Sequence, residues 1–297
     1  SPAARAQECA KQRENNSSCL QDTTLVEKLR VLMLGVSLPR PVNVQNPSAR
    51  GLTFEPHHFK SMDGLQLEAW HRPVVGEGPS ILLFPGYGGA KADLLPIAAE
   101  FHQEGAEVWL VDFRGCGGSA GSMTTLGFHE AGDVAAAAEF ASIHSGPKRP
   151  LLLYGTSMGA AAVLRATSLG WVKPTGLILE CPFDRLLSTA GNRFHAMGLP
   201  AFPIAHFLVF WGGVQLGFNG FAHNPVEYAR AIRCPSLLLV GERDPRVTPE
   251  QAAEIGRNLG TQGRLVRFPE LGHQSYLAAQ PKRWREEVFG FVRATVG

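Results

Sequence analysis

The sequence of 297 residues predicts an α/β fold with a mostly parallel central sheet, helices on both faces and a small helical cap. Three observations lead to this prediction. Short apolar blocks alternate with helical stretches, and one long apolar insertion interrupts this alternation. Ser157 lies in the turn between the block at residues 151–154 and the helical stretch that follows it. The blocks carry no charge except the last, which is typical of strands buried on both faces.

Six apolar blocks predict the parallel strands, at residues 81–84, 108–111, 151–154, 177–179, 237–240 and 265–268. The stretches between and after them predict helices at residues 93–104, 130–143, 158–169, 249–259 and 281–295. Before this core, residues 52–60 and 65–71 predict a hairpin, because Asp63-Gly64 suits the positive φ of a tight turn. We expect this hairpin to pair antiparallel at one sheet edge.

The insertion and the first residues complete the predicted domain organisation. Residues 184–230 are far longer than a usual loop and are rich in aromatic side chains, so we expect a cap over the carboxyl ends of the strands. The alternative is that these aromatics only fill the edge of the core. The core would comprise residues 51–183 and 231–297, the cap would comprise residues 184–230, and residues 1–50 would form an N-terminal arm.

Composition excludes several classes of function. The 28 Lys and Arg nearly balance the 26 Asp and Glu, and no large basic cluster is present, which argues against nucleic acid as a partner. No run of about 18 apolar residues exists, so no transmembrane segment is predicted. Paired Cys-x-x-Cys spacing is missing, so a zinc site has little support and no metal site is predicted. The oligomeric state stays open.

Two further features bear on the cellular compartment. Cys9 and Cys19 lie ten residues apart in a polar segment and are predicted to form a disulfide, with two free thiols as the alternative. The chain begins at Ser1 without Met, and its first residues resemble a processed end. We therefore expect an exported protein, periplasmic or secreted, and otherwise a cytoplasmic one.

The strongest chemical motif is Gly155-Thr156-Ser157-Met158-Gly159. It follows a predicted strand directly and leads into an Ala-rich helix. A nucleophilic serine needs such a sharp turn, with small neighbours that let the backbone pack tightly and the hydroxyl project. Ser157 is therefore the predicted nucleophile.

A serine hydroxyl needs an imidazole to accept its proton. Of the ten histidines, His273 lies in the loop after the sixth block, and loops at that end of a parallel sheet converge on the serine. His57, His58 and His71 fall on the edge hairpin and are weaker candidates. We expect His273 to be the general base.

The third member must be a carboxylate that orients the imidazole. Asp244 follows the fifth block, and the order Ser, Asp, His along the chain fits this architecture. Asp184 and Glu242 are the alternatives.

The oxyanion hole needs two donors, and we expect them to be the backbone N–H groups of Met158 and Tyr87. Tyr87 lies in the glycine-rich turn after the first parallel block. Its ring is also a predicted substrate contact, together with Phe183, Phe207 and Trp211.

These motifs resemble the α/β-hydrolase superfamily of serine hydrolases, from about residue 52 to the C-terminus. The segments Asp112-Phe113-Arg114-Gly115-Cys116-Gly117-Gly118-Ser119 and Gly241-Glu242-Arg243-Asp244 are similar to the BEM46-like and serine-aminopeptidase-like subgroup. Pro85-Gly86-Tyr87 with Ser157-Met158-Gly159 is similar to cutinase-like polyesterases, although Thr156 stands where those usually carry Trp.

The resemblance implies acyl hydrolysis without a cofactor. We expect a carboxylesterase or lipase-type enzyme that cleaves a small-molecule ester through an acyl-enzyme. The alternatives are an aminopeptidase or amidase, an acyltransferase or thioesterase, a polyester hydrolase, and a non-catalytic binding module on the same scaffold. An aminopeptidase would hold a free amine with a carboxylate near the cap, for which Asp184, Glu180 and Glu227 are candidates.

Overall fold

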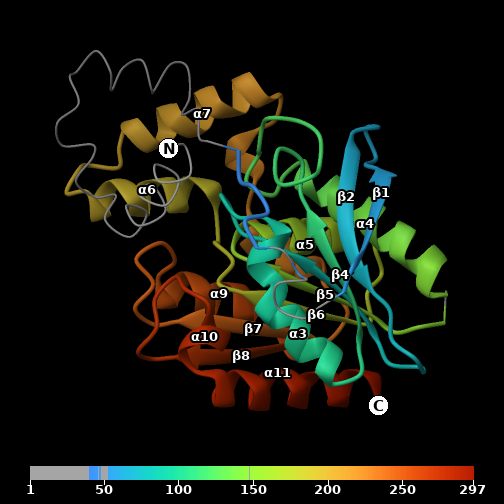
Figure 1. The fold of residues 1–297 in the computed structure, drawn as a ribbon. Helices are drawn as coiled ribbons and strands as arrows, with labels where there is room; N and C mark the ends of the chain where they lie inside the picture. The colour runs from blue at the N-terminus through green and yellow to red at the C-terminus, as the bar shows by residue number, and fades with distance from the viewer. Residues whose placement is uncertain (1–39, 46, 48–52, 147) are drawn as a thin grey trace, which may run out of the picture.

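The computed structural model describes residues 40–45, 47, 53–146 and 148–297 (Figure 1). These residues form an eight-stranded sheet with the strand order β1-β2-β4-β3-β5-β6-β7-β8. The strands are β1 (Glu55–Lys60), β2 (Gln66–Arg72), β3 (Ser80–Phe84), β4 (Glu107–Asp112), β5 (Leu151–Thr156), β6 (Gly176–Glu180), β7 (Ser236–Gly241) and β8 (Gly263–Phe268). The predicted disulfide between Cys9 and Cys19 lies outside the described residues.

The hairpin at the sheet edge is confirmed. β1 pairs antiparallel with β2, β2 pairs antiparallel with β4, and every other neighbouring pair is parallel. Gly64 in the connecting turn has φ +84°, a conformation that suits glycine. All six predicted blocks form strands of the same sheet, and the fold class predicted from the sequence is therefore correct.

Helices cover both faces of the sheet, as Figure 1 shows. The longer ones are α3 (Leu95–Gln103), α4 (Glu130–Ser145), α5 (Met158–Ser168), α6 (Leu186–Ala196), α7 (Ile204–Leu216), α9 (Pro249–Asn258) and α11 (Pro281–Val296). The predicted helix at 93–104 differs at its start, because a 3₁₀ turn occupies Lys91–Leu94 and α3 begins at Leu95. Pro96 fits the first turn of α3, where no intrahelical N–H bond is needed.

Alternation along the strands divides the core into two layers. Leu82 and Phe84 face a cluster that includes the alanines of α4 and α5, whereas Ile81 and Leu83 face a cluster that includes side chains of α3 and α11. Both faces of the central strands are thus apolar, which explains why the blocks lack charge. The tight fit of α5 against the sheet also fixes the turn in front of it.

The insertion at residues 184–230 contains α6, α7, α8 (Pro225–Tyr228) and a 3₁₀ turn at Gly220–Ala222, and a second 3₁₀ turn at Ala229–Ala231 crosses its end. α6 and α7 pack against each other and lie to one side of the sheet (Figure 1). From α6, the Asn192 side chain donates to the carbonyl of Arg246 at 2.9 Å, in the loop after β7. His223, also in the insertion, contacts the carbonyl of Leu126 in the loop after β4 at 3.0 Å. The insertion therefore contacts the loops after two strands, and the division of the chain into arm, core and cap stays a prediction.

Candidate active site

Ser157 occupies the turn between β5 and α5 with φ +50° and ψ −111°, a conformation that is costly for a residue with a Cβ. Its N–H donates to the carbonyl of Glu180 at 2.7 Å. A Cβ on Gly159 would lie 2.4 Å from the carbonyl oxygen of Phe84, and one on Gly155 would lie 2.6 Å from the N of Ala160. The two glycines of the motif therefore permit the close packing that holds the serine in this conformation.

The loops after β7 and β8 are joined through their main chains. The N–H of Arg243 donates to the carbonyl of Leu271 at 2.9 Å. A Cβ on Gly241 would lie only 2.3 Å from that same oxygen, so the two loops touch at the end of β7. This contact brings Asp244, from the first loop, beside His273, from the second.

The three predicted side chains meet in a continuous chain of hydrogen bonds. His273 Nε2 lies 3.0 Å from Ser157 Oγ, and His273 Nδ1 lies 2.6 Å from Asp244 Oδ2. Both distances fall within the range of a hydrogen bond. The imidazole is 13% exposed and the carboxylate 2%, so water has little access to the bond between them. Ser157 and His273 are 116 positions apart along the chain. They meet because the carboxyl ends of the parallel strands lie at the same edge of the sheet.

Asp244 is held by the main chain as well as by the imidazole. Its Oδ1 accepts from the N–H of Arg246 at 2.7 Å and from the N–H of Val247 at 3.3 Å. Each carboxylate oxygen therefore has a donor, and this fixes the orientation of the buried group. A carboxylate oriented in this way can select the tautomer of the histidine in which Nε2 accepts the serine proton.

The alternative acids face other partners. Asp184 Oδ2 accepts from Arg185 Nη1 at 3.1 Å, and burial raises the pKa of this carboxyl. Glu242 Oε1 lies 3.7 Å from Arg267 Nη1. Of the three carboxylates considered, Asp244 is the one that contacts the His273 ring.

The turn after β3 lies next to the serine. A Cβ on Gly86 would be 3.5 Å from the Cβ of Ser157, which is ordinary contact. Tyr87 follows it, half-buried, and burial raises the pKa of its phenol. Met158, on the other side of the serine, is buried, and its Sδ accepts from Thr124 Oγ1 at 3.3 Å. These positions suit the two predicted oxyanion amides, whose function stays a prediction.

The predicted substrate contacts fall in three places. Tyr87 lies beside the serine, as described. Phe183 is buried and packs edge-on against His223, with ring centroids 5.4 Å apart. Phe207 and Trp211 stack on each other along α7 with centroids 6.4 Å apart. A role of Phe183, Phe207 and Trp211 in substrate binding stays a prediction.

Two neighbours of the site had no signal in the sequence strong enough to single them out. The guanidinium of Arg193, on α6, lies 5.9 Å from the centroid of the Tyr87 ring. Cys181, directly after β6, has φ +44° and is buried, and burial raises the pKa of its thiol well above the usual range. Its position after a parallel strand is the one clue that the sequence offered.

Among the described residues, the only group of side chains near Ser157 that could hold a metal consists of Cys181, Asp244 and His273. The Cys181 Sγ and one donor atom each of Asp244 and His273 lie within 4.8 Å of one another. Asp244 Oδ2 and His273 Nδ1 are already hydrogen-bonded to each other, however. This arrangement favours proton transfer over metal binding at the serine.

Comparisons with known proteins agree with the fold and the motifs. Residues 79–199 match the family model described as serine aminopeptidase, S33. The chain is 29% identical over 266 residues to the α/β hydrolase domain-containing protein WAV2 of Arabidopsis thaliana, covering 84% of this chain and 82% of that protein. It is 26% identical over 238 residues to protein bem46 of Schizosaccharomyces pombe, covering 78% and 74% of the two chains.

A third relative matches over a shorter stretch. The chain is 32% identical over 143 residues to an uncharacterized membrane protein of Saccharomyces cerevisiae, and this match spans 48% of the chain and only half of that protein. Within the described part of the present chain, none of the helices has the length and hydropathy of a membrane span.

Among solved structures, an esterase of Pyrococcus furiosus superposes with a TM-score of 0.75 at 23% identity. The superposition covers 88% of this chain and 98% of the esterase. At that identity the likeness establishes the fold, and the chemistry must be argued from the residues themselves.

Proposed function

We propose that this chain, which has an α/β-hydrolase fold and is similar to the BEM46-like subgroup, hydrolyses carboxylic esters through an acyl-enzyme on Ser157. One observation carries the proposal. Hydrogen bonds run from Ser157 Oγ to His273 Nε2 at 3.0 Å and from His273 Nδ1 to Asp244 Oδ2 at 2.6 Å, behind a serine held at φ +50°. This is the geometry that nucleophilic catalysis by serine requires.

The reaction proceeds in two steps. Ser157 Oγ attacks the ester carbonyl while His273 Nε2 takes the hydroxyl proton, and the carbonyl oxygen becomes an oxyanion. His273 then gives its proton to the departing alcohol, which leaves the acyl group on Ser157. Water attacks the acyl-enzyme with the same base, and the acid is released as the serine regains its proton.

Electrostatics favour each charged species along this path. Asp244 remains ionised and stabilises the imidazolium that forms on His273. The oxyanion is assigned to the backbone N–H groups of Met158 and Tyr87, and the amino end of α5 contributes its dipole. Loss of one such donor typically costs about 3 kcal/mol of transition-state stabilisation.

Ester cleavage is favoured over aminopeptidase activity by the state of the nearby carboxylates. Glu180 is buried and accepts from the Tyr154 hydroxyl and from the N–H of Tyr276. Asp184 pairs with Arg185, and Glu227 pairs with Arg230 at 2.8 Å. The three candidates for holding a substrate amine are therefore engaged in internal contacts.

The apolar character of the insertion points to the acyl side of the substrate. α7 contains no Asp, Glu, Lys or Arg, and several large side chains on it are exposed, namely Phe207, Leu208, Phe210 and Val214. Such a surface suits an alkyl or aryl group better than a sugar or a charged peptide.

The test combines labelling with a substrate panel. A fluorophosphonate probe should label the wild-type chain and not Ser157→Ala, and p-nitrophenyl esters of increasing acyl length should be turned over while aminoacyl anilides are not. The loss in kcat/KM for Ser157→Ala should be at least about 10⁴-fold. The matched control is Ser168→Ala, whose hydroxyl donates to the Arg165 carbonyl at the far end of α5.

The outcomes separate the alternatives. Labelling of Ser157→Ala equal to wild type would refute the assignment of the nucleophile. Faster turnover of anilides than of esters would favour the aminopeptidase. Transfer of the acyl group to an added alcohol or thiol, measured as product, would indicate an acyltransferase that uses the same intermediate.

A further inference from the structure

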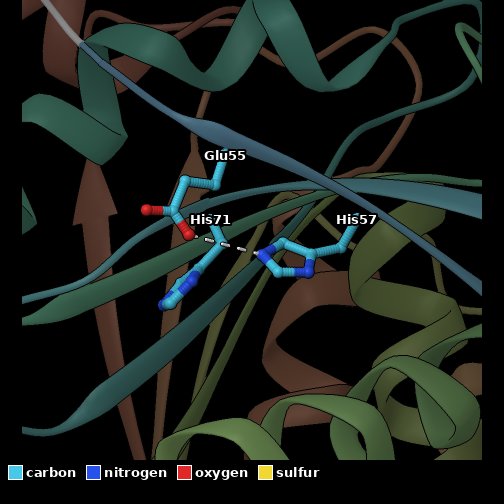
Figure 2. Close-up of side chains that lie close together, drawn as sticks. All are labelled: Glu55, His57 and His71. Atoms are coloured by element: carbon cyan, nitrogen blue, oxygen red, sulfur yellow. Dashed lines mark ion pairs between the residues drawn. The ribbon is translucent and has the colours of Figure 1, made fainter.

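A second group of imidazole and carboxylate side chains lies on the edge hairpin. Glu55 and His57 are two residues apart on β1 and so face the same side of the sheet. His71 pairs directly with Glu55 across the ladder, so it shares that face. Figure 2 shows the three side chains converging from the two strands.

The donor atoms are close enough to share one ion. One donor atom from each residue lies within 4.8 Å of the other two, and His57 Nε2 is 3.8 Å from Glu55 Oε2. Ligands at about 2.0–2.2 Å from a tetrahedral metal are separated by roughly 3.3–3.5 Å. Glu55 can make this adjustment, because its side chain is 65% exposed and free to rotate toward the rings.

The two histidines differ in their partners. His71 Nε2 lies 2.8 Å from Glu107 Oε1, and the ring stacks on Trp109 with centroids 3.8 Å apart. His57 Nε2 is buried and has no hydrogen-bond partner among the described residues. Burying a ring nitrogen without a hydrogen-bond partner costs free energy of folding. We therefore expect this atom to bind a group that accepts its lone pair.

We propose that Glu55, His57 and His71 form a binding site for a divalent transition-metal cation of the Zn²⁺ class, with Glu107 orienting His71. Two imidazoles and one carboxylate match the preference of Zn²⁺, and they exclude Ca²⁺ and Mg²⁺, which take oxygen ligands. Water completes the coordination on the exposed side of the hairpin. A metal-binding histidine usually donates its other ring N–H to a carboxylate or carbonyl, which fixes the orientation of the ring. In this site Glu107 would serve that purpose for His71.

His57 is surrounded by other titratable groups. Burial, together with the nearby imidazoles of His71 and His144, lowers the pKa of His57. His144 comes from α4, and its Nδ1 contacts the Phe140 carbonyl at 2.9 Å. Among the described residues, the carboxylates near the cluster include Glu55 and Glu107, and Glu107 Oε2 lies 3.7 Å from Arg149 Nε.

The site is far from Ser157 in the topology. His71 pairs with Trp109 near the amino end of β4, whereas Ser157 follows the carboxyl end of β5. Three strands, β2, β4 and β3, separate β1 from β5, which is a lateral distance of roughly 19 Å. A cation there would tie β1 to β2 at the sheet edge without touching the proposed reaction.

The experiment titrates Zn²⁺ into the chelator-treated full chain carrying His273→Ala, which removes the donor group around Cys181. We expect one Zn²⁺ per chain, a dissociation constant below about 10 µM, and a rise in Tm of roughly 2–5 °C at 100-fold excess over Kd. Adding Glu55→Gln or His57→Ala should weaken binding at least tenfold. The matched control is His58→Ala, because His58 is the next residue on β1 and faces Glu68 on the other side.

A Co²⁺ spectrum distinguishes the remaining possibilities. Nitrogen and oxygen ligands give only weak visible bands, whereas a thiolate adds a strong near-ultraviolet absorption. Weak bands that disappear in Glu55→Gln support the hairpin site. The proposal is refuted by binding that folded Glu55→Gln and His57→Ala retain in full, by a thiolate absorption at one equivalent, or by no binding below about 100 µM.

Discussion

Two groups of imidazole and carboxylate side chains lie on the same sheet, one on the edge hairpin and the other in the loops after β5, β7 and β8, and they are built for different chemistry. In the group at Ser157, both ring nitrogens of His273 have partners, Ser157 Oγ on one side and Asp244 Oδ2 on the other. In the hairpin group, His57 Nε2 has no hydrogen-bond partner among the described residues, and Glu55 Oε2 lies 3.8 Å from it. The same residue types can therefore transfer a proton or bind a cation, depending on which atoms lie next to the ring nitrogens.

Rigidity separates the two groups as well. Asp244 is 2% exposed and receives two main-chain N–H bonds, so it cannot turn away from His273. Glu55 is 65% exposed and lies at the start of an edge strand. Proton transfer needs a fixed geometry, whereas a metal site can close around its ion as it binds.

The largest expected effect tests the rigid group. Asp244→Asn should lower kcat/KM for p-nitrophenyl esters by about 10⁴-fold, because the amide favours the wrong tautomer of His273. Asp184→Asn, which changes an equally buried carboxylate that faces Arg185, should lower it by less than about tenfold. The reverse ranking would show that the acid was wrongly assigned.

A further histidine, outside both groups, adds a test based on protein stability. His223 is buried, with Nδ1 3.1 Å from the Tyr228 hydroxyl and Nε2 3.0 Å from the Leu126 carbonyl, and burial lowers its pKa to about 4. The unfolded chain takes up this proton near pH 6.5 and the folded chain does not, so the free energy of unfolding falls as the pH drops from about 6.5 to 4.

The measurement is urea unfolding at pH 7.5 and at pH 5. Between these values His223 should account for a loss of about 2 kcal/mol. His223→Gln should show a correspondingly smaller pH dependence, while its stability at pH 7.5 is lower because the ring's packing is lost. An identical pH dependence in the two proteins would mean that His223 is protonated in the folded state.

The smallest expected effect tests whether the two groups are independent. Glu55→Gln and His57→Ala should each leave kcat/KM for esters within about twofold of wild type, since three strands lie between β1 and β5. Steady-state kinetics with and without a chelator would measure this. A loss comparable to that of Asp244→Asn would show that the groups are coupled.

The central strands and the serine turn could be predicted from the sequence because local patterns determine them. Charge-free apolar blocks need burial on both faces, and Gly155 and Gly159 are required by contacts within a few residues or with the adjacent strand. His273 could be predicted because the carboxyl ends of parallel strands meet at one edge.

Contacts that depend on register or on the path of the insertion could not be predicted. His57 and His71 share a face because Glu55 pairs with His71, and that register is set by the whole hairpin. Arg193 reaches the Tyr87 ring only through the placement of α6, and no periodicity in the insertion encodes this. Cys181 lies close to Asp244 because β6 and β7 are neighbours in the sheet.

The main-chain bond between Arg243 and Leu271 has a consequence for engineering. Because backbone atoms join the two loops, the identities of most side chains in them are free to vary while the carboxylate and the imidazole keep their alignment. A library that changes substrate range can therefore randomise residues of the helical insertion and keep both loops as they are. We expect variants from such a library to keep the alignment of Asp244 with His273.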